Sequence, residues 1–258
     1  MSNKVWGTYV SDTSYMYCAS AITAYFGTEY EIESVEDWKP TAFAHGNIQI
    51  TDDGSLRNNG KEFITVPLSF EQSLKGFDEL RKSLKLGDDP YSYRTSTHVH
   101  VNVMTMETTK LRQMVLLYAL LEPVFFEYAG QSRKQNIHCV PLNYTLLPKY
   151  YGMSLDKLIA CWSKYTAFNL LPVKKYGTVE FRHLGGTGDR ARYERWLCLI
   201  NDLWSFSMDT SPNWLRDSLY AGASWEDIRK QVLPSSVGLN PPATEIRASL
   251  IDVKLAFV

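Results

Sequence analysis

Acidic, imidazole and guanidinium side chains recur at a spacing of two residues in three segments of the chain. The three pairs are Glu29 with Glu31, His98 with His100, and Glu180 with Arg182. Residues two apart on a β-strand point to the same face, so each pair presents two reactive groups side by side. Converging carboxylates and imidazoles suit divalent cations, and a guanidinium beside them suits a phosphate. Together the pairs predict a polar sheet face that binds metal ions and an anion.

Other polar residues are weaker indications of a site when each is taken alone. Asp53 and Ser55 lie in a predicted hairpin loop, whose composition the turn itself explains. Glu62 begins an apolar strand, where a carboxylate is unexpected. Arg133, with Asn136 after it, follows a predicted helix end, where a basic residue is commonly a surface charge. These residues support a site only if the fold brings them to the same face.

Purely structural explanations also exist for the stronger segments. A solvated strand face explains the carboxylates at 29, 31 and 33, and a weak cross-strand ion pair explains Glu180 with Arg182. The glycine-rich turn at 185–189 either leads into the next helix or cradles an anion at its N-terminus, and it matches neither a Rossmann nor a P-loop motif. Gathered in a core, however, these charges cannot remain uncompensated. Two or more divalent cations with a polyphosphate would compensate them.

The elements that must position these residues follow from hydrophobic periodicity. Strands are expected at about 23–34, 46–51, 62–67, 95–104 and 178–184. Helices are expected at about 70–85, 109–129, 154–167, 189–208 and 224–232, with N-caps at Ser154, Asp189 and Ser224. An irregular tail is expected to open at 235–242. The order predicts an α+β fold with a mostly antiparallel sheet, helices on one face and an open active-site face.

The composition is that of a soluble globular protein. Of 258 residues, 28 are acidic and 27 basic, and the resulting formal charge of −1 gives no basic excess for binding nucleic acid or anionic lipid. The four cysteines form no CxxC pair and are expected to be free thiols in a reducing compartment. Neither a secretory signal nor an apolar run long enough to span a bilayer is apparent. We therefore expect a cytoplasmic protein without nucleic-acid or membrane partners.

Taken in order, these segments resemble the amidoligase family of the carboxylate–amine ligase group, which shares the catalytic fold of glutamine synthetase and glutamate–cysteine ligase. The resemblance lies in G-x-E-x-E at 27–31, D-x-S at 53–55, G-x-E with a strand and Pro at 60–67, H-V-H-V-N at 98–102, Arg133 with Asn136, a helix into F-N-L at 168–170, and T-V-E-F-R at 178–182 followed by Gly-Thr at 186–187. It implies one amidoligase-like domain over 1–258, with a core at 22–210. The segments 1–21 and 211–258 match nothing in the family's pattern.

The resemblance implies ATP-dependent formation of an amide or peptide-like bond, assisted by two or three Mg²⁺ or Mn²⁺ ions. A substrate carboxylate attacks the γ-phosphoryl of ATP to give an acyl phosphate, and an amine then displaces phosphate. Both substrates are unidentified and belong to a small molecule, a peptide or a protein. A homo-oligomer is compatible with this group. Small stand-alone members are common in phage genomes, and such a protein would work in the host cytoplasm.

The resemblance also implies roles for individual residues. One metal site would consist of Glu29, His98 and Glu180, and the other of Glu31 and Glu62 together with Asp53, for which Asp52 is a second candidate. The catalytic residues would be Arg182, which stabilises the transferring phosphoryl group, with Glu180 and Glu62. His100 and Arg133 would contact nucleotide phosphates, and Asn169, Ser55 and Thr187 would contact nucleotide or substrate. Glu33 extends the acidic row beyond the family's pattern.

Two other functions use the same residues. A metal-dependent hydrolase would employ the Glu and His set with water as the reacting partner. A binding or structural protein could retain the fold without catalysis. Arg182 beside Glu180 favours phosphoryl chemistry over simple hydrolysis, and the presence of every metal-binding residue type argues against a decayed site. We therefore expect the ATP-dependent ligase.

Overall fold

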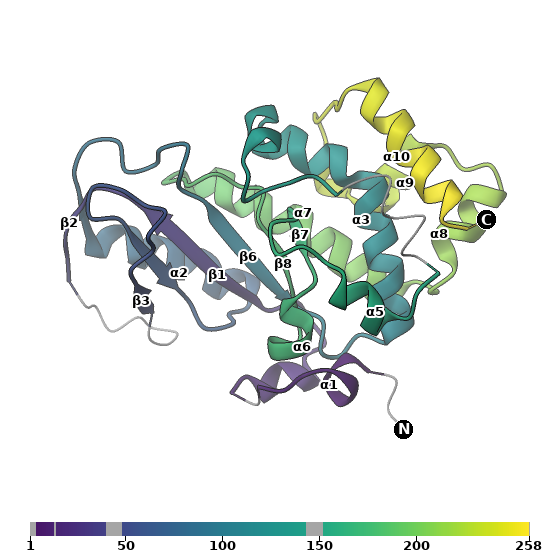
Figure 1. Cartoon of the computed structure of the whole chain (residues 1–258), viewed down its shortest axis with the longest axis horizontal. Helices are drawn as coiled ribbons and strands as arrows, with labels where there is room; N and C mark the ends of the chain where they lie inside the picture. Colours follow the sequence, from purple (N-terminus) through teal and green to yellow (C-terminus); the bar gives the residue numbers. More distant parts are fainter. Residues whose placement is uncertain (1–3, 13, 40–47, 143–151, 258) are drawn as a thin grey trace.

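The computed structural model describes residues 4–12, 14–39, 48–142 and 152–257. Its centre is a six-stranded sheet of order β3-β4-β1-β6-β8-β7, in which every neighbouring pair is antiparallel (Figure 1). In that order the strands are Gln49–Thr51, Lys61–Ile64, Phe26–Ile32, Thr97–Asn102, Thr178–Phe181 and Phe168–Asn169. A separate pair joins β2 (Val35–Trp38) to β5 (Leu84–Leu86).

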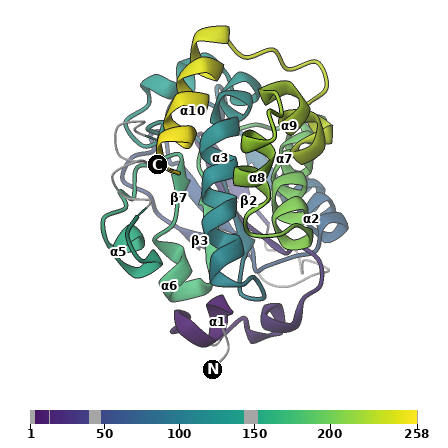
Figure 2. The same cartoon turned by 90° about the vertical axis from the view of Figure 1, so that its right-hand side faces the viewer.

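Three helices cover the apolar face of the sheet, namely α2 (Phe70–Ser83), α3 (Thr108–Ala129) and α7 (Arg190–Asp209). The ring of Tyr193 on α7 stacks on Phe77 of α2 with centroids 4.8 Å apart. Tyr118 on α3 stacks on Phe168 of β7 at 4.3 Å. In Figure 2, α3 stands upright near the centre, with α7 and α2 to its right. This aromatic layer buries one face of each central strand. The polar side chains of these strands project from the other face.

The alternation along each strand decides which side chains enter the helical layer. On β6, Val99 and Val101 are fully buried under the helices. His98 and His100 alternate with these valines along the strand and therefore project from the opposite face. β1 and β8 follow the same rule, so their carboxylates lie with the two imidazoles of β6 on the face that the helices do not cover.

The remaining elements surround this core. They are α1 (Val5–Thr8), η1 (Met16–Ser20), η2 (Gln131–Gln135), α5 (Leu155–Ala160), α6 (Pro172–Tyr176), α8 (Trp214–Tyr220), α9 (Trp225–Val232), η3 (Pro234–Ser236) and α10 (Ala243–Leu255). Helix α10 packs along α3 (Figure 2). Of the described residues, none belongs to a helix long and apolar enough to cross a membrane.

The structure confirms the α+β class, the mostly antiparallel sheet and the five predicted helices, with two boundary corrections. The helix expected at 154–167 ends at Ala160, because the following residues turn so that Phe168 and Asn169 pair with β8. The helix expected at 70–85 ends at Ser83, since Leu84 begins a strand paired with β2. All four cysteines are free, as predicted.

The prediction that an irregular tail opens at 235–242 is wrong for the residues that follow, because a helix covers Ala243–Leu255. α10 follows it directly, because Pro242 stands at the N-cap, where a proline interrupts no helical hydrogen bond. The apolar face of α10 packs on α3, which stabilises a helix that the periodicity alone does not reveal. The short helix α8, ahead of α9, was also not predicted.

Candidate metal and substrate site

Cross-strand register brings the three sequence pairs together. Glu29 of β1 lies directly opposite His98 of β6, and His100 lies opposite Glu180 of β8. Since directly opposed side chains on one sheet face stand about 4.5–5.5 Å apart at Cβ, these four groups meet over three adjacent strands. The sheet topology therefore converts pairs that are 70 to 150 residues apart in sequence into one polar surface.

We call the first group of converging residues the central cluster: Glu29, His100 and Glu180. Each offers one oxygen or nitrogen atom, and these atoms lie within 4.8 Å of one another. Nε2 of His100 is 3.3 Å from Oε1 of Glu29. The resemblance placed His98 in this set and His100 on the nucleotide, whereas the converging atoms include His100. His98 nevertheless lies beside it, with Nδ1 3.3 Å from Glu29 and 3.5 Å from Glu180.

A second group, the edge cluster, consists of Glu31, Asp53 and Glu62, whose oxygen atoms also lie within 4.8 Å of one another. Glu31 and Glu62 are paired across β1 and β4. Asp53 comes from the loop after β3, and its side chain is held by the backbone N–H of Ser55 at 2.7 Å. Asp52, the second candidate, forms an ion pair with Lys61, and its side chain is 85% exposed. Of the two candidates, Asp53 is therefore the one whose side chain converges with Glu31 and Glu62.

His98 connects the two clusters. Its Nδ1 faces Glu29 and Glu180, and its Nε2 lies 3.9 Å from Oε1 of Glu31. The ring is buried, yet Nε2 has no hydrogen-bond partner among the described residues. A buried unsatisfied nitrogen is costly unless something binds it. The carboxylate oxygens and imidazole nitrogens gathered here fit a hard divalent cation, and the imidazoles also suit Mn²⁺.

The electrostatics of the clusters are strongly perturbed. Burial opposes ionisation of Glu29, but hydrogen bonds from His100 and His98 outweigh it and hold the pKa of Glu29 well below its usual range. Burial likewise opposes charge on His100, while the hydrogen bond to Glu29 raises its pKa above the ordinary value. Burial, and then the charge of Glu29, raises the pKa of Glu62. Negative charge is therefore concentrated where little solvent screens it.

Glu180 is held from two sides. Its Oε2 accepts a hydrogen bond from Asn169 Nδ2 at 2.8 Å, and its Oε1 forms an ion pair with Arg182. Arg182 Nε also donates to the backbone oxygen of His138 at 3.0 Å. Asn169, expected to contact nucleotide or substrate, thus positions Glu180 in this structure. This follows from its place on β7, directly opposite Glu180.

Arg133 reaches the site from η2 and is buried. Its Nε donates to the carbonyl of His183 at 2.7 Å, and its Nη2 donates to Ser96 Oγ at 2.9 Å and to the carbonyl of Arg182 at 3.1 Å. Burial lowers the pKa of this guanidinium. Asn136 binds the backbone N–H of His138 at 2.8 Å and so shapes the neighbouring loop. Arg133 therefore stabilises the segment just after β8, which carries Arg182.

The glycine-rich turn serves as a helix lead-in. The Asp189 carboxylate accepts from the backbone N–H groups of Ala191 and Arg192 and caps α7, which leaves these groups unavailable to an anion. Thr187 Oγ1 accepts from the backbone of Asp189 at 3.0 Å, so it stabilises the turn. Gly186 pairs with Thr95, where an added Cβ would lie 2.2 Å from Oγ1.

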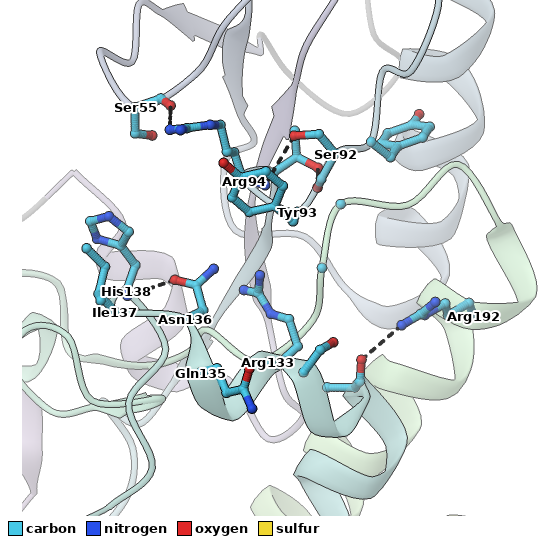
Figure 3. A pocket seen from close by; sticks show the side chains of 16 residues that line it. Ser55, Ser92, Tyr93, Arg94, Arg133, Gln135, Asn136, Ile137, His138 and Arg192 are labelled. Atoms are coloured by element: carbon cyan, nitrogen blue, oxygen red, sulfur yellow. Dashed lines mark hydrogen bonds between the residues drawn. The ribbon is translucent and has the colours of Figure 1, made fainter.

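Two hollows flank the polar surface at opposite ends of the strands. The arginine cavity, of about 670 Å³, is lined by residues that include Arg94, Arg133 and Arg192 (Figure 3). The tyrosine cavity, of about 250 Å³, is lined by Tyr15, Tyr25 and Tyr176 and reaches Glu29 and His100. Arg94, Arg192 and the three tyrosines were not among the residues predicted from the sequence, because they lie in loops and at helix ends and share no diagnostic spacing.

Comparison with protein families identifies a matching family. A family model described as "Putative amidoligase enzyme" matches residues 11–204. This range contains both clusters, all three arginines of the arginine cavity and the three tyrosines of the other. The search of curated proteins found no match.

Proposed function

Because this chain belongs to the amidoligase family, we propose that it is an ATP-dependent ligase that joins a carboxylate to an amine through an acyl phosphate. The observation that carries the proposal is the pair of three-residue clusters joined by His98 on one sheet face. Phosphoryl transfer from ATP needs charge neutralisation over several phosphate oxygens, and two adjacent cation sites are suited to it. The polar face of the sheet would then be the catalytic surface, as in the glutamine synthetase-like catalytic domains.

The residues fit Mg²⁺ or Mn²⁺. Glu29, His100 and Glu180 would hold one ion and Glu31, Asp53 and Glu62 another, with His98 available to either. When bound, these ions would neutralise the phosphates of ATP and lower the repulsion that an incoming carboxylate meets. The clusters themselves supply the fixed, closely spaced carboxylates that such a role requires.

Arg182 supports the phosphoryl step. One carboxylate oxygen of the substrate attacks the γ-phosphorus, the bond from phosphorus to the bridging oxygen breaks, and ADP leaves. An amine then attacks the acyl carbon, gives up a proton, and phosphate leaves as the amide forms. Arg182 is anchored through Glu180 and the His138 carbonyl, which orients a cation beside the reacting oxygens. A preorganised cation of this kind stabilises developing charge without reorganising during the step.

The two hollows would hold different substrates, the nucleotide base in the tyrosine cavity and the carboxylate substrate in the arginine cavity. The tyrosine cavity contains three phenol rings and also Met104, and it touches Glu29 and His100 of the central cluster. A flat, neutral base packs well on such rings, and its phosphates would then extend over the cluster beside His100. The arginine cavity lies at the other end, next to Arg182. Arg133 lines it, so we propose that Arg133 acts on the side of the carboxylate substrate rather than on the nucleotide.

The test is binding of an ATP analogue with Mn²⁺, followed by turnover. A non-hydrolysable ATP analogue should bind only with a divalent cation, and Glu180→Gln should remove that binding. ADP release should require a carboxylate and an amine, and Arg182→Ala should reduce it by about 10³-fold or more while the fold is retained. Arg195→Ala, on the same helix as Arg192 but outside both hollows, is the control. ADP release that water alone supports would favour the hydrolase, and absence of any nucleotide binding would refute both.

A further inference from the structure

The arginine cavity gathers positive charge from three distant parts of the chain. Arg94 comes from the loop before β6, Arg133 from η2 and Arg192 from the first turn of α7, and they surround one hollow (Figure 3). No acidic residue lines this cavity in the part of the chain that the structure describes. None of the three arginines forms an ion pair with a described carboxylate. No described carboxylate therefore neutralises the positive charge of the cavity.

Arg94 is the least satisfied of the three. Its Nη1 lies 3.4 Å from the carbonyl of Ser55, a long contact, and its Nε is buried without a hydrogen-bond partner among the described residues. Arg133 already donates to two carbonyls and a hydroxyl. Arg192 donates to the carbonyl of Ala129 at 3.1 Å and stands exposed at the rim. A buried guanidinium nitrogen without an acceptor marks a place where a ligand oxygen is expected.

The cavity is contiguous with the reacting groups. His138, which lines it, supplies the carbonyl that anchors Arg182. Ser55 also lines it, and its backbone N–H holds Asp53 of the edge cluster. A molecule with one carboxylate beside Arg182 would therefore extend into the arginine cavity. Its volume, about 670 Å³, accommodates an amino-acid derivative or a short peptide end.

We propose that the arginine cavity selects a carboxylate substrate that carries a second, non-reacting carboxylate, bound chiefly by Arg94 with Arg192 at the rim. The substrate class is thus a dicarboxylic acid or an acidic peptide end. This inference rests on the proposed ligase function. A guanidinium matches a carboxylate bidentately, and such charge-assisted pairs are roughly twice as strong as neutral hydrogen bonds, which makes the second carboxylate the specificity element.

Glutarate and valerate test the proposal directly, because both have five carbons and only glutarate has a second carboxylate. Binding to the full-length chain is measured by calorimetry with and without Mg²⁺, in the absence of nucleotide. An acetylated triglutamate peptide serves as a longer probe. Glutarate or the peptide should bind, and valerate should bind at least about tenfold more weakly. Arg94→Met should weaken glutarate or peptide binding about tenfold or more, Arg192→Met less, and Arg195→Met not at all.

The outcomes separate this inference from the ligase proposal. If neither glutarate nor the peptide binds, or if Arg94→Met leaves binding unchanged, the inference is wrong even when ATP binds normally. If ADP or inorganic phosphate occupies the cavity through Arg94 and the dicarboxylates do not, the cavity belongs to the nucleotide and the inference is wrong. If glutarate binds through Arg94 but no ATP analogue binds, the cavity stands as an anion site and the ligase proposal fails.

Discussion

Glu31 on β1 lies directly opposite Glu62 on β4, on the face of the sheet that the helices leave uncovered. Like charges in directly opposed positions destabilise a sheet. Asp53 adds a third carboxylate, whose oxygen lies within 4.8 Å of the other two. Glu62 receives only one side-chain hydrogen bond among the described residues, from Thr51 at 2.9 Å. The folded chain thus keeps an electrostatic repulsion that a bound cation would relieve.

Removal of one of these charges should stabilise the metal-free protein. We expect Glu62→Gln to raise the free energy of unfolding in EDTA by about 0.5–1 kcal/mol, because the cross-strand repulsion is lost. The same substitution should abolish the stabilisation that Mn²⁺ gives to the wild type. Denaturant unfolding with EDTA and with Mn²⁺ measures both effects. Glu71→Gln, at an exposed position of α2, is the control. A lower free energy of unfolding for Glu62→Gln than for the wild type in EDTA would contradict the prediction.

Asp53 and Asp52 provide a matched pair for the edge cluster. Asp53→Asn should weaken one class of Mn²⁺ sites by about tenfold or more, since it loses one of three converging carboxylates. Asp52→Asn should change Mn²⁺ affinity less than about twofold, because its side chain is solvated and paired with Lys61. Titration of free Mn²⁺ by electron paramagnetic resonance distinguishes them. Equal effects of the two substitutions would remove Asp53 from the site.

The buried carboxyl of Glu122 should make stability depend on pH. It accepts hydrogen bonds from Tyr118 Oη at 2.6 Å and from the Leu142 N–H at 2.7 Å, and burial raises its pKa to about 7. A pKa raised above the unfolded value means that the folded state binds the proton more tightly. The stabilisation is therefore full below about pH 4.5 and is lost as pH rises through about 7.

Glu122→Gln measures this contribution, because the amide keeps an acceptor for both donors and does not ionise. Between pH 4.5 and pH 8 the wild type should lose about 3 kcal/mol of unfolding free energy relative to Glu122→Gln, because only the wild-type side chain ionises over this range. Denaturant unfolding across this range gives the difference between the two proteins. Parallel pH profiles would show that the carboxyl does not titrate there.

Gly186 and Gly185 test the close approach behind the arginine cavity. In Gly186→Ala the new Cβ would lie 2.2 Å from Thr95 Oγ1 and 2.7 Å from Thr95 Cβ, so the backbone pair must separate. We expect a destabilisation of about 1–3 kcal/mol. In Gly185→Ala the nearest atom is Arg133 Cδ at 3.9 Å, an ordinary contact, and stability should change little. Thermal unfolding of both variants measures the difference. Equal unfolding midpoints for Gly186→Ala and Gly185→Ala would contradict the prediction.

The amino-acid sequence by itself determined which side chains share a strand face. Alternation is a local property of extended backbone, so the pairs at 29 and 31, 98 and 100, and 180 and 182 could be assigned to the polar face without a fold. The same local reasoning predicted α2, α3 and α7, whose apolar faces bury the opposite side of β1, β6 and β8.

Only the tertiary structure decided which groups meet. Strand order and register result from packing between distant segments, and they set Glu31 against Glu62 and His100 against Glu180. They also place Asn169, which was expected just after a helix predicted at 154–167, on a strand, where it binds Glu180. The arginine cavity combines a loop, a 3₁₀ helix and a helix start, which share no sequence period. Long-range packing, rather than local preference, therefore determines the chemistry of this face.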